Sequence, residues 1–384
     1  IRICNMKIAI VKETEDLEKR VSASPETVKK FISLGFSVDI EKDAGVSSFF
    51  SNESYKNAGA NIVTDTKTLI SSADIVLKVN TVHKDGNGSD NIKYYNKGTK
   101  VIGFLKPLQN QDKIKDLANN HIDAFSVELI PRISRAQSMD VLSSQANLAG
   151  YKAVIEASSI FKKAMPMMMT AAGTIIPAKC LVLGAGVAGL QAVATAKRLG
   201  CVVSVFDVRP EVEEQVNSLG AKFIHVDQKK ELEGSKLVYA KEMSDEYKKK
   251  QSEKIHEVSK EMDIIISTAL IPGKKAPLLI KSNTIKSMKS GSVLIDLAAS
   301  AGGNIEGSVF GKKVSIENTI LYAPSNLPSL ISYDASLLYS KNLFNFVTTF
   351  INEEKKFDLD EEDEILKKTL IIKNGKKTTF FLKD

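Results

Sequence analysis

Three glycines and one aspartate have the spacing of a site that binds a nucleotide. Gly184, Gly186 and Gly189 form the pattern GxGxxG between an apolar run, KCLVLG, and a helical pattern, GLQAVATAKRLG. Asp207 follows 18 residues after Gly189, at the end of the strand-like run VVSVFD. Such glycines permit a tight turn, a close approach of the backbone to a pyrophosphate, and close packing of helix on strand. Because the helix N-terminus supplies amide donors, the pattern predicts a dinucleotide-binding site.

Asp207 bears on which dinucleotide is bound. A carboxylate at this strand end accepts hydrogen bonds from ribose hydroxyls and repels a 2′-phosphate, which favours NAD over NADP. The alternative is NADP, whose 2′-phosphate the positive charge of Arg209 could bind. A further alternative is a degenerate Rossmann domain that binds no nucleotide. The expected cofactor-binding residues of these two turns are Gly184, Gly186, Val187, Ala188, Gly189, Asp207, Val208 and Arg209.

A second polar cluster precedes a helical pattern. The stretch PRISRAQSMD, residues 131–140, has almost no helical or strand periodicity but carries Arg132, Arg135, Gln137 and Asp140. These side chains either solvate a surface connector or reach into a site, because loops of α/β folds often carry function. Gln137 can both donate and accept hydrogen bonds, and an ion pair of Asp140 with Arg132 would hold the loop. Arg135 is expected to contact solvent or phosphate.

The elements around these residues alternate between strand-like and helical runs, which is typical of βαβ units. The predicted fold class is α/β, with two doubly wound, Rossmann-like domains of mostly parallel sheets and a C-terminal hairpin tail. Asn374-Gly375, between two β-prone runs, is the hairpin signal. The expected domains are a first α/β domain over 1–140 completed by a helix in 330–356, a Rossmann NAD(H)-binding domain over 141–329, and an acidic linker with a hairpin tail over 357–384.

Composition narrows the class of protein. The 384 residues are 43% hydrophobic and 26% charged, as in globular proteins of two or three domains. The net charge of +7 is spread widely over the sequence, which argues against nucleic-acid binding. Three cysteines, none in a CxxC pair, suit a reducing compartment, and the four scattered histidines predict no metal site. No apolar run approaches the roughly 20 residues that span a bilayer. The start at Ile1 and the acidic tail suggest excision from a longer membrane polypeptide.

Several long motifs resemble the alanine dehydrogenase / pyridine nucleotide transhydrogenase family, over roughly residues 6–350. Within the family the sequence is most similar to the NAD(H)-binding domain I of the alpha subunit of proton-translocating NAD(P) transhydrogenase. The motifs are EKRVSASPETVKK (18–30), RAQSMDVLSSQANLAGY (135–151), MPMMMTAAGTIIPAK (165–179), LGAGVAGLQAVATAKRLG (183–200), DVRPEVEEQVNSLGAKF (207–223), YAKEMS (239–244) and TALIPGKKAP (268–277).

The resemblance implies roles for particular residues. The 131–140 loop would reach over the nicotinamide, with Arg132, Gln137 and Asp140 as the catalytic set and Ser143 as a contact on the nicotinamide side. Tyr239 would belong to a loop that closes over the nucleotide, although a tyrosine can also simply pack. The segment TALIPG would line the cofactor, through Thr268, Ala269 and Leu270. The methionine-rich stretch MPMMMTAAG is expected to fill core rather than do chemistry.

Two activities occur in this family. The segment GFLKPLQN resembles the transhydrogenase pattern through PLQN, although Lys106 stands where that pattern leads us to expect an aromatic residue. For alanine dehydrogenase the positions of Arg20 and Lys78 are kept, but the same segment lacks the histidine expected beside the carbonyl. Because amino-acid oxidation needs a proton-transfer group, this absence argues against it. Transhydrogenation needs no acid or base, since hydride passes directly between two nicotinamides. A non-catalytic NAD-binding module is a third possibility.

The resemblance also implies cofactors and partners. NAD(H) would bind here and NADP(H) on a partner domain III, with a membrane domain II coupling the reaction to proton movement. The chain would be a homodimer, with the helix patterns 147–161 and 335–351 as candidate contact surfaces. It would be a soluble domain peripheral to an energy-transducing membrane, on the cytoplasmic or mitochondrial-matrix side.

Overall fold

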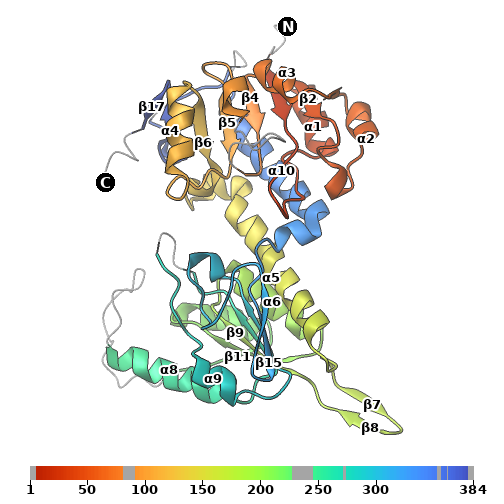
Figure 1. Ribbon diagram of the computed structural model, residues 1–384, viewed down its shortest axis with the longest axis vertical. Helices are drawn as coiled ribbons and strands as arrows, with labels where there is room; N and C mark the ends of the chain where they lie inside the picture. The colour runs from red at the N-terminus through yellow and green to blue at the C-terminus, as the bar shows by residue number, and fades with distance from the viewer. Residues whose placement is uncertain are drawn as a thin grey trace. The chain divides into compact units, whose positions relative to one another are not determined.

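The computed structural model describes residues 6–80, 91–226, 245–270, 274–352, 356–360 and 362–378. The chain divides into two compact units (Figure 1). Unit 1 comprises Ile1–Gln145 with Pro328–Asp384, and unit 2 comprises Ala146–Leu327. Each unit is built on a parallel-rich sheet, so the predicted α/β fold class is confirmed.

Unit 1 contains an eight-stranded sheet in the order β17-β16-β6-β5-β4-β1-β2-β3. The parallel strands are β1 (Lys7–Ile10), β2 (Ser37–Glu41), β3 (Asn61–Val63), β4 (Ile75–Leu77), β5 (Lys100–Gly103) and β6 (Asp123–Ser126). Successive residues of β1 and of the position after it belong to different hydrophobic cores. Ile8 and Ile10 lie in one core, and Ala9 and Val11 lie in the other. Both faces of the sheet are therefore covered, as in a doubly wound fold.

Helices from both ends of the chain cover this sheet. They are α1 (Pro25–Ser33), α2 (Asn52–Asn57), α3 (Thr66–Ser71), α4 (Gln111–Asn119), the 3₁₀ helix η4 (Ser134–Met139), α10 (Ser332–Thr349) and α11 (Glu364–Thr369). Helix α1 begins after Ser24, whose side chain caps it, with Pro25 at the first position. Helix α10 buries Tyr339, Leu343 and Phe346 completely, so a late segment completes the unit 1 core.

The C-terminal tail belongs to unit 1 and differs from the expected linker. The residues that follow its acidic stretch form α11, at whose start Asp363 caps the backbone N–H groups of Ile365 and Leu366. Strands β16 (Leu370–Lys373) and β17 (Lys376–Lys377) form a hairpin around Asn374 and Gly375, which have φ angles of 50° and 77°. β16 pairs antiparallel with β6, and this pairing attaches the hairpin to the sheet.

Unit 2 contains a seven-stranded sheet in the order β11-β10-β9-β12-β13-β15-β14, parallel except for β14. The strands are β9 (Lys179–Leu183), β10 (Val202–Phe206), β11 (Lys222–Phe223), β12 (Ile264–Ser267), β13 (Val293–Asp296), β14 (Lys313–Ile316) and β15 (Thr319–Tyr322). The helices are α5 (Val141–Ile160, which contains the boundary between the units), α6 (Val187–Arg198), α7 (Glu213–Ser218), α8 (Asp245–Ser259) and α9 (Ser282–Ser287). The strand order reverses between β9 and β12, the point at which open α/β sheets bind ligands.

A separate hairpin projects from the rest of unit 2 (Figure 1). It consists of β7 (Met168–Thr170) and β8 (Gly173–Ile175), all of whose residues are exposed. Only Met165 of the methionine-rich stretch is buried, so the expectation of core filling is wrong for Met167, Met168 and Met169. As for the membrane, none of the helices in the described ranges of the chain is long and apolar enough to cross one.

Candidate nucleotide-binding site

The turn between β9 and α6 needs two of its glycines because of its own backbone conformation and packing. Gly184 has a φ of 95°, a conformation that side-chain-bearing residues rarely adopt. A β-carbon on Gly189 would lie 1.8 Å from the carbonyl oxygen of Gly184. No side chain fits there, so Gly189 lets α6 start directly against the turn.

Gly186 differs from these two glycines. A β-carbon placed on it meets no atom within 4 Å, and no side chain caps α6 at this residue. The protein itself therefore does not require glycine here, while the first N–H groups of α6, beginning with Val187 and Ala188, stay without a side-chain cap. A helix start of this kind binds phosphate through backbone donors and the helix dipole.

Helix α5 supports the first turn of α6 from behind. A β-carbon on Gly150 would lie 2.0 Å from the carbonyl oxygen of Ala188, so the two helix backbones are in direct contact. The prediction from the sequence missed Gly150. An isolated glycine inside the helical pattern NLAGYKAV was the available signal, because such a glycine costs helix stability unless packing needs it.

Asp207 closes the other side of the turn. Its Oδ2 accepts the N–H of Ala185 at 2.6 Å, and its Oδ1 accepts the backbone N–H of Arg209 at 2.9 Å and the Arg209 Nε–H at 3.0 Å. Burial acts to raise the pKa of Asp207, but the hydrogen bonds from Arg209 and Ala185 outweigh it and hold the pKa below its ordinary value. The Asp207 carboxylate is thus ionised at neutral pH. Its neighbour in the chain, Val208, is exposed. Arg209, the alternative phosphate ligand, is bonded to Asp207.

The segment after β12 packs against the same turn. The hydroxyl of Thr268 donates to the carbonyl of Gly184 at 3.0 Å, and its backbone N–H donates to the carbonyl of Leu183 at 2.8 Å. Leu270 is 51% exposed. The structure thus brings Thr268 and Ala269 together with the glycine turn, at the reversal of strand order in unit 2.

A buried asparagine, missed by the prediction, fixes this segment. Asn304 Oδ1 accepts from the Ala269 N–H at 3.1 Å and from the Ser267 hydroxyl at 2.8 Å. Its Nδ2 donates to the carbonyls of Ala269 and Pro277 at 2.9 and 2.8 Å. Every hydrogen-bonding position of this amide is used. Asp296 in turn accepts the Asn304 N–H at 2.9 Å, so the end of β13 supports the clamp.

The 131–140 loop lies in unit 1 and is organised differently from the expectation. Asp140 accepts the N–H of Ser143 at 2.8 Å and its hydroxyl at 2.6 Å, which makes Asp140 the cap of α5. The predicted pairing of Asp140 with Arg132 is therefore wrong. The side chains of Arg132 and Gln137 are exposed.

Two further predictions have different outcomes. Arg135 does not simply face solvent or phosphate, because its guanidinium forms an ion pair of 2.6 Å with Asp363. Tyr239 lies outside the described residues, so its closing role stays a prediction.

Unit 1 holds a buried ionic cluster where its own strand order reverses, beyond the carboxyl ends of β1 and β4. Arg20 donates from Nε and Nη2 to Glu18 at 2.8 and 2.7 Å and from Nη1 to Gln145 at 2.9 Å. Lys78 is completely buried, and Glu13 accepts the N–H of Val79 at 2.7 Å. Burial raises the pKa of Glu13 to about 7, against the opposing attraction of Lys78. Arg20 is thus already engaged in a fork with a carboxylate of its own chain.

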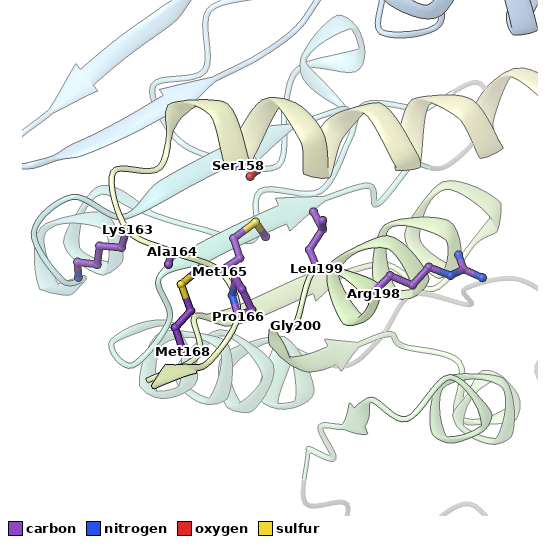
Figure 2. Close-up of a pocket in the computed structure, with 9 residues that line it drawn as sticks. All are labelled: Ser158, Lys163, Ala164, Met165, Pro166, Met168, Arg198, Leu199 and Gly200. Atoms are coloured by element: carbon purple, nitrogen blue, oxygen red, sulfur yellow. The ribbon is translucent and has the colours of Figure 1, made fainter. Parts of the chain in front are cut away.

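A cavity of about 430 Å³ lies at the opposite end of α6 from the glycine turn. Figure 2 shows Met165, Pro166 and Leu199 at its centre, with Lys163 and Arg198 extending to opposite sides. Its lining is mainly apolar and it lies a helix length away from Gly186, so this cavity is not the nucleotide site. Within the described ranges no group of three or more His, Cys, Asp or Glu side chains could hold a metal ion.

The chain is similar to known proteins over nearly its whole length. The family models described as "Alanine dehydrogenase/PNT", N-terminal domain and C-terminal domain, match residues 9–149 and 153–379. A protein of Rhodospirillum rubrum named as the first portion of NAD(P) transhydrogenase subunit alpha is 47% identical over 375 residues, covering 96% of this chain and 97% of that protein. Its namesake in Rickettsia prowazekii (strain Madrid E) is 44% identical and covers 99% of this chain and 98% of that protein. The solved structure of transhydrogenase from Sinorhizobium meliloti has a TM-score of 0.87 and 45% identity, covering 97% of this chain and 100% of that chain.

Proposed function

The chain belongs to the alanine dehydrogenase/PNT family, and from that membership we propose that it is the NAD(H)-binding component of a proton-translocating NAD(P) transhydrogenase. In this role it holds NAD(H) while hydride passes to or from NADP(H) on a partner domain. The carrying observation is the glycine turn of unit 2, where Gly184 and Gly189 are needed by the chain itself but Gly186 is not. A glycine that the packing of the protein does not need, at a helix start that no side chain caps, leaves room for a phosphate-bearing ligand.

The residues of this chain bind and orient the nucleotide. The first N–H groups of α6 hold the pyrophosphate, and Asp207 accepts from the adenosine ribose, which favours NAD(H) over NADP(H). Thr268, Ala269 and Leu270 line the path toward the nicotinamide. Arg132, Gln137, Asp140 and Ser143 act on the nicotinamide side, where Gln137 is exposed and so can reach a second nucleotide. NAD(H), when bound, supplies or receives the hydride at its nicotinamide ring, and the rate depends on how well the two rings are held together.

Alanine dehydrogenation is the alternative within the family. It needs a proton-transfer group, and the described histidine of unit 1, His121, lies just before β6, at the opposite end of the parallel strands from the 104–110 segment. The fork of Arg20 is occupied by Glu18 and so is not open to a substrate carboxylate. These two observations favour transhydrogenation. A non-catalytic NAD-binding module is the remaining alternative.

A homodimer is included in the proposal, and the β7–β8 hairpin is its proposed contact. The hairpin and its flanks expose Met167, Met169 and Ile176 by 62%, 77% and 79%. A lone two-stranded hairpin is marginal in water, and a projecting apolar patch is typical of a protein interface. A mainly apolar cavity lies at the base of the hairpin (Figure 2), and in the proposed dimer it would receive these side chains from a second copy.

The remaining partners are proposed from the same membership. The NADP(H) site lies on a domain III and proton movement on a membrane domain II, with this chain peripheral to an energy-transducing membrane on its cytoplasmic or matrix side.

One experiment tests the activity. The purified chain is mixed with a transhydrogenase NADP(H)-binding domain, NADPH and an oxidised NAD analogue, and the reduced analogue is followed by absorbance. We expect hydride exchange that requires both proteins. NADH formation from NAD and alanine by the chain alone would instead establish the dehydrogenase, and NADH binding without either reaction would establish the binding module.

A further inference from the structure

The 131–140 loop is attached to α10 at one carbonyl group. The oxygen of Ser138 accepts from Asn342 Nδ2 and from Asn345 Nδ2, both at 2.9 Å. A carbonyl oxygen has two lone pairs, so these two amides saturate it. Ser138 lies between Gln137 and Asp140 in the chain, so these two hydrogen bonds hold the backbone between two of the proposed catalytic residues.

Asn342 extends the same attachment into α5. Its Oδ1 accepts from the hydroxyl of Ser144 at 2.8 Å, one residue beyond Ser143, and the residue as a whole is only 8% exposed. A single buried amide therefore fixes the position of η4 relative to the first turn of α5. Asp140, which caps that turn, lies between the two attachment points.

A second anchor comes from the C-terminal tail. Arg135 donates from Nη2 to Asp363 Oδ2 at 2.6 Å, while Asp363 Oδ1 caps α11. Burial acts to raise the pKa of Asp363, but the hydrogen bond from Arg135 and the capping N–H groups hold it below its ordinary value. Asp363 is therefore ionised at neutral pH. It caps α11 in the tail and also pairs with Arg135 in the loop. Its side chain is 14% exposed, so solvent screens this pair less than a fully exposed one.

We infer that Asn342, Asn345 and Asp363 are positioning residues, which hold the 131–140 loop in the geometry that hydride transfer requires. The inference rests on the proposed function. It assigns the C-terminal tail an indirect role in the reaction, because α11 fixes Arg135. The physical reason is preorganisation: Gln137 projects from a turn that is braced on two sides, so less ordering is needed when the nicotinamides meet.

Two substitutions isolate the anchors without removing other contacts. Asn345→Ala removes one amide from Ser138 at a half-buried position. Asp363→Asn removes the charge that pairs with Arg135 but keeps a good helix cap, since asparagine caps as well as aspartate. Matched controls are Lys341→Gln on α10, which breaks the ion pair with Glu26, and Glu362→Gln beside α11, which breaks the pair with Lys367.

The full chain is measured in three ways: NADH dissociation constant by fluorescence, amide hydrogen exchange of residues 134–140, and single-turnover hydride exchange with an NADP(H)-loaded partner domain. The double variant combines Asn345→Ala with Asp363→Asn. In it we expect faster exchange of the Ala136 and Asp140 amides, whose N–H groups donate to carbonyl groups of the same loop. We also expect hydride exchange to fall about tenfold to a hundredfold, with the NADH dissociation constant within about twofold of wild type. The controls should match wild type in all three.

Each outcome decides something. Unchanged amide exchange in the double variant would overturn the inference. Faster amide exchange with an unchanged hydride rate would also overturn it, because the loop would then be braced for stability alone. A wild-type chain that exchanges no hydride would count against the proposed function instead, and amide exchange, which needs no partner domain, would still decide whether these residues anchor the loop.

Discussion

Asn304 holds both polar groups of the Ala269 backbone: its side-chain oxygen accepts the Ala269 N–H at 3.1 Å and its side-chain nitrogen donates to the Ala269 carbonyl at 2.9 Å. The two residues are 35 positions apart, and Asn304 is fully buried. This relationship fixes the segment that packs against the glycine turn.

Asn304→Asp keeps the size of the side chain but turns both donated hydrogen bonds into contacts between oxygens. We expect a loss of roughly 2–4 kcal/mol in unfolding free energy and an NADH dissociation constant raised about tenfold, because the Ala269 peptide loses its fixed position. Ser308→Ala is the control, since Ser308 bonds Asp296 in the same loop without touching Ala269. Calorimetry and NADH titration check both effects, and an unchanged NADH affinity in a folded Asn304→Asp protein would contradict the assigned role.

Gly186→Ala should separate binding from folding. The added methyl group meets no protein atom, so the expected loss of stability is only that of alanine relative to glycine at a helix N-cap, about 1 kcal/mol. The NADH dissociation constant should rise about tenfold or more, which is about 1.4 kcal/mol or more, because the methyl group occupies the space of the pyrophosphate. Gly189→Ala, which overlaps a carbonyl, should instead destabilise the protein by about 3 kcal/mol. Equal NADH affinity of wild type and Gly186→Ala would argue against a phosphate at this turn.

Asp207→Ala should change the preference between the two cofactors. Without the carboxylate the ribose loses its acceptor, and Arg209 is released from its present bonds, so NADH should bind about tenfold more weakly and NADPH no more weakly than before. Arg209→Ala is the matched variant, and it should keep the NADH preference. Fluorescence titration with both cofactors gives the ratio; a ratio that Asp207→Ala leaves at the wild-type value would show that Asp207 does not select the sugar.

Glu13 should make the stability of unit 1 depend on pH. Burial raises its pKa from the ordinary value of 4.5 to about 7, so between these values the native state holds a proton that the unfolded chain releases. Its contribution is therefore fully present below about pH 4.5 and is lost as pH rises through 7. The unfolding free energy of wild type relative to Glu13→Gln should fall by roughly 2–3 kcal/mol across this window, at about 1.4 kcal/mol per pKa unit. Denaturation at pH 5 and pH 8 measures the difference, and a parallel pH dependence in the two proteins would exclude it.

The exposed hairpin gives a prediction about assembly. Replacing Met169 and Ile176 with glutamate should shift the chain from the proposed dimer to a monomer, because charges replace side chains that would each contribute about 1.5–3 kcal/mol when buried. Phe310→Glu, at another exposed apolar position of unit 2, is the control and should leave the assembly unchanged. Sedimentation at several concentrations reports the state. A variant that remains dimeric would place the contact elsewhere.

Sequence by itself determined the α/β class, the glycine turn and the acidic strand end. These features are local: strand, three glycines, helix and Asp207 lie within 30 residues, and each follows from periodicity or from the conformational freedom of glycine. The hairpin around Asn374 and Gly375 was predictable for the same reason. The prediction that Met167–Met169 fill the core was wrong. It rested on local pattern alone, and three consecutive apolar residues give the same pattern in a core and in an exposed hairpin.

Only the tertiary structure decided how the site residues are held. The bonds from Asn342 and Asn345 to Ser138 span 204 and 207 residues, and the pair of Arg135 with Asp363 spans 228. No periodicity links such positions, since they meet only after the C-terminal segment has packed onto unit 1. Asp140 differs, because its partner Ser143 is only three residues away and an aspartate before a helical run is a local capping signal, yet its carboxylate was expected to pair with Arg132. In the folded chain it caps α5 instead, because two donors of Ser143 lie within reach once the helix has formed.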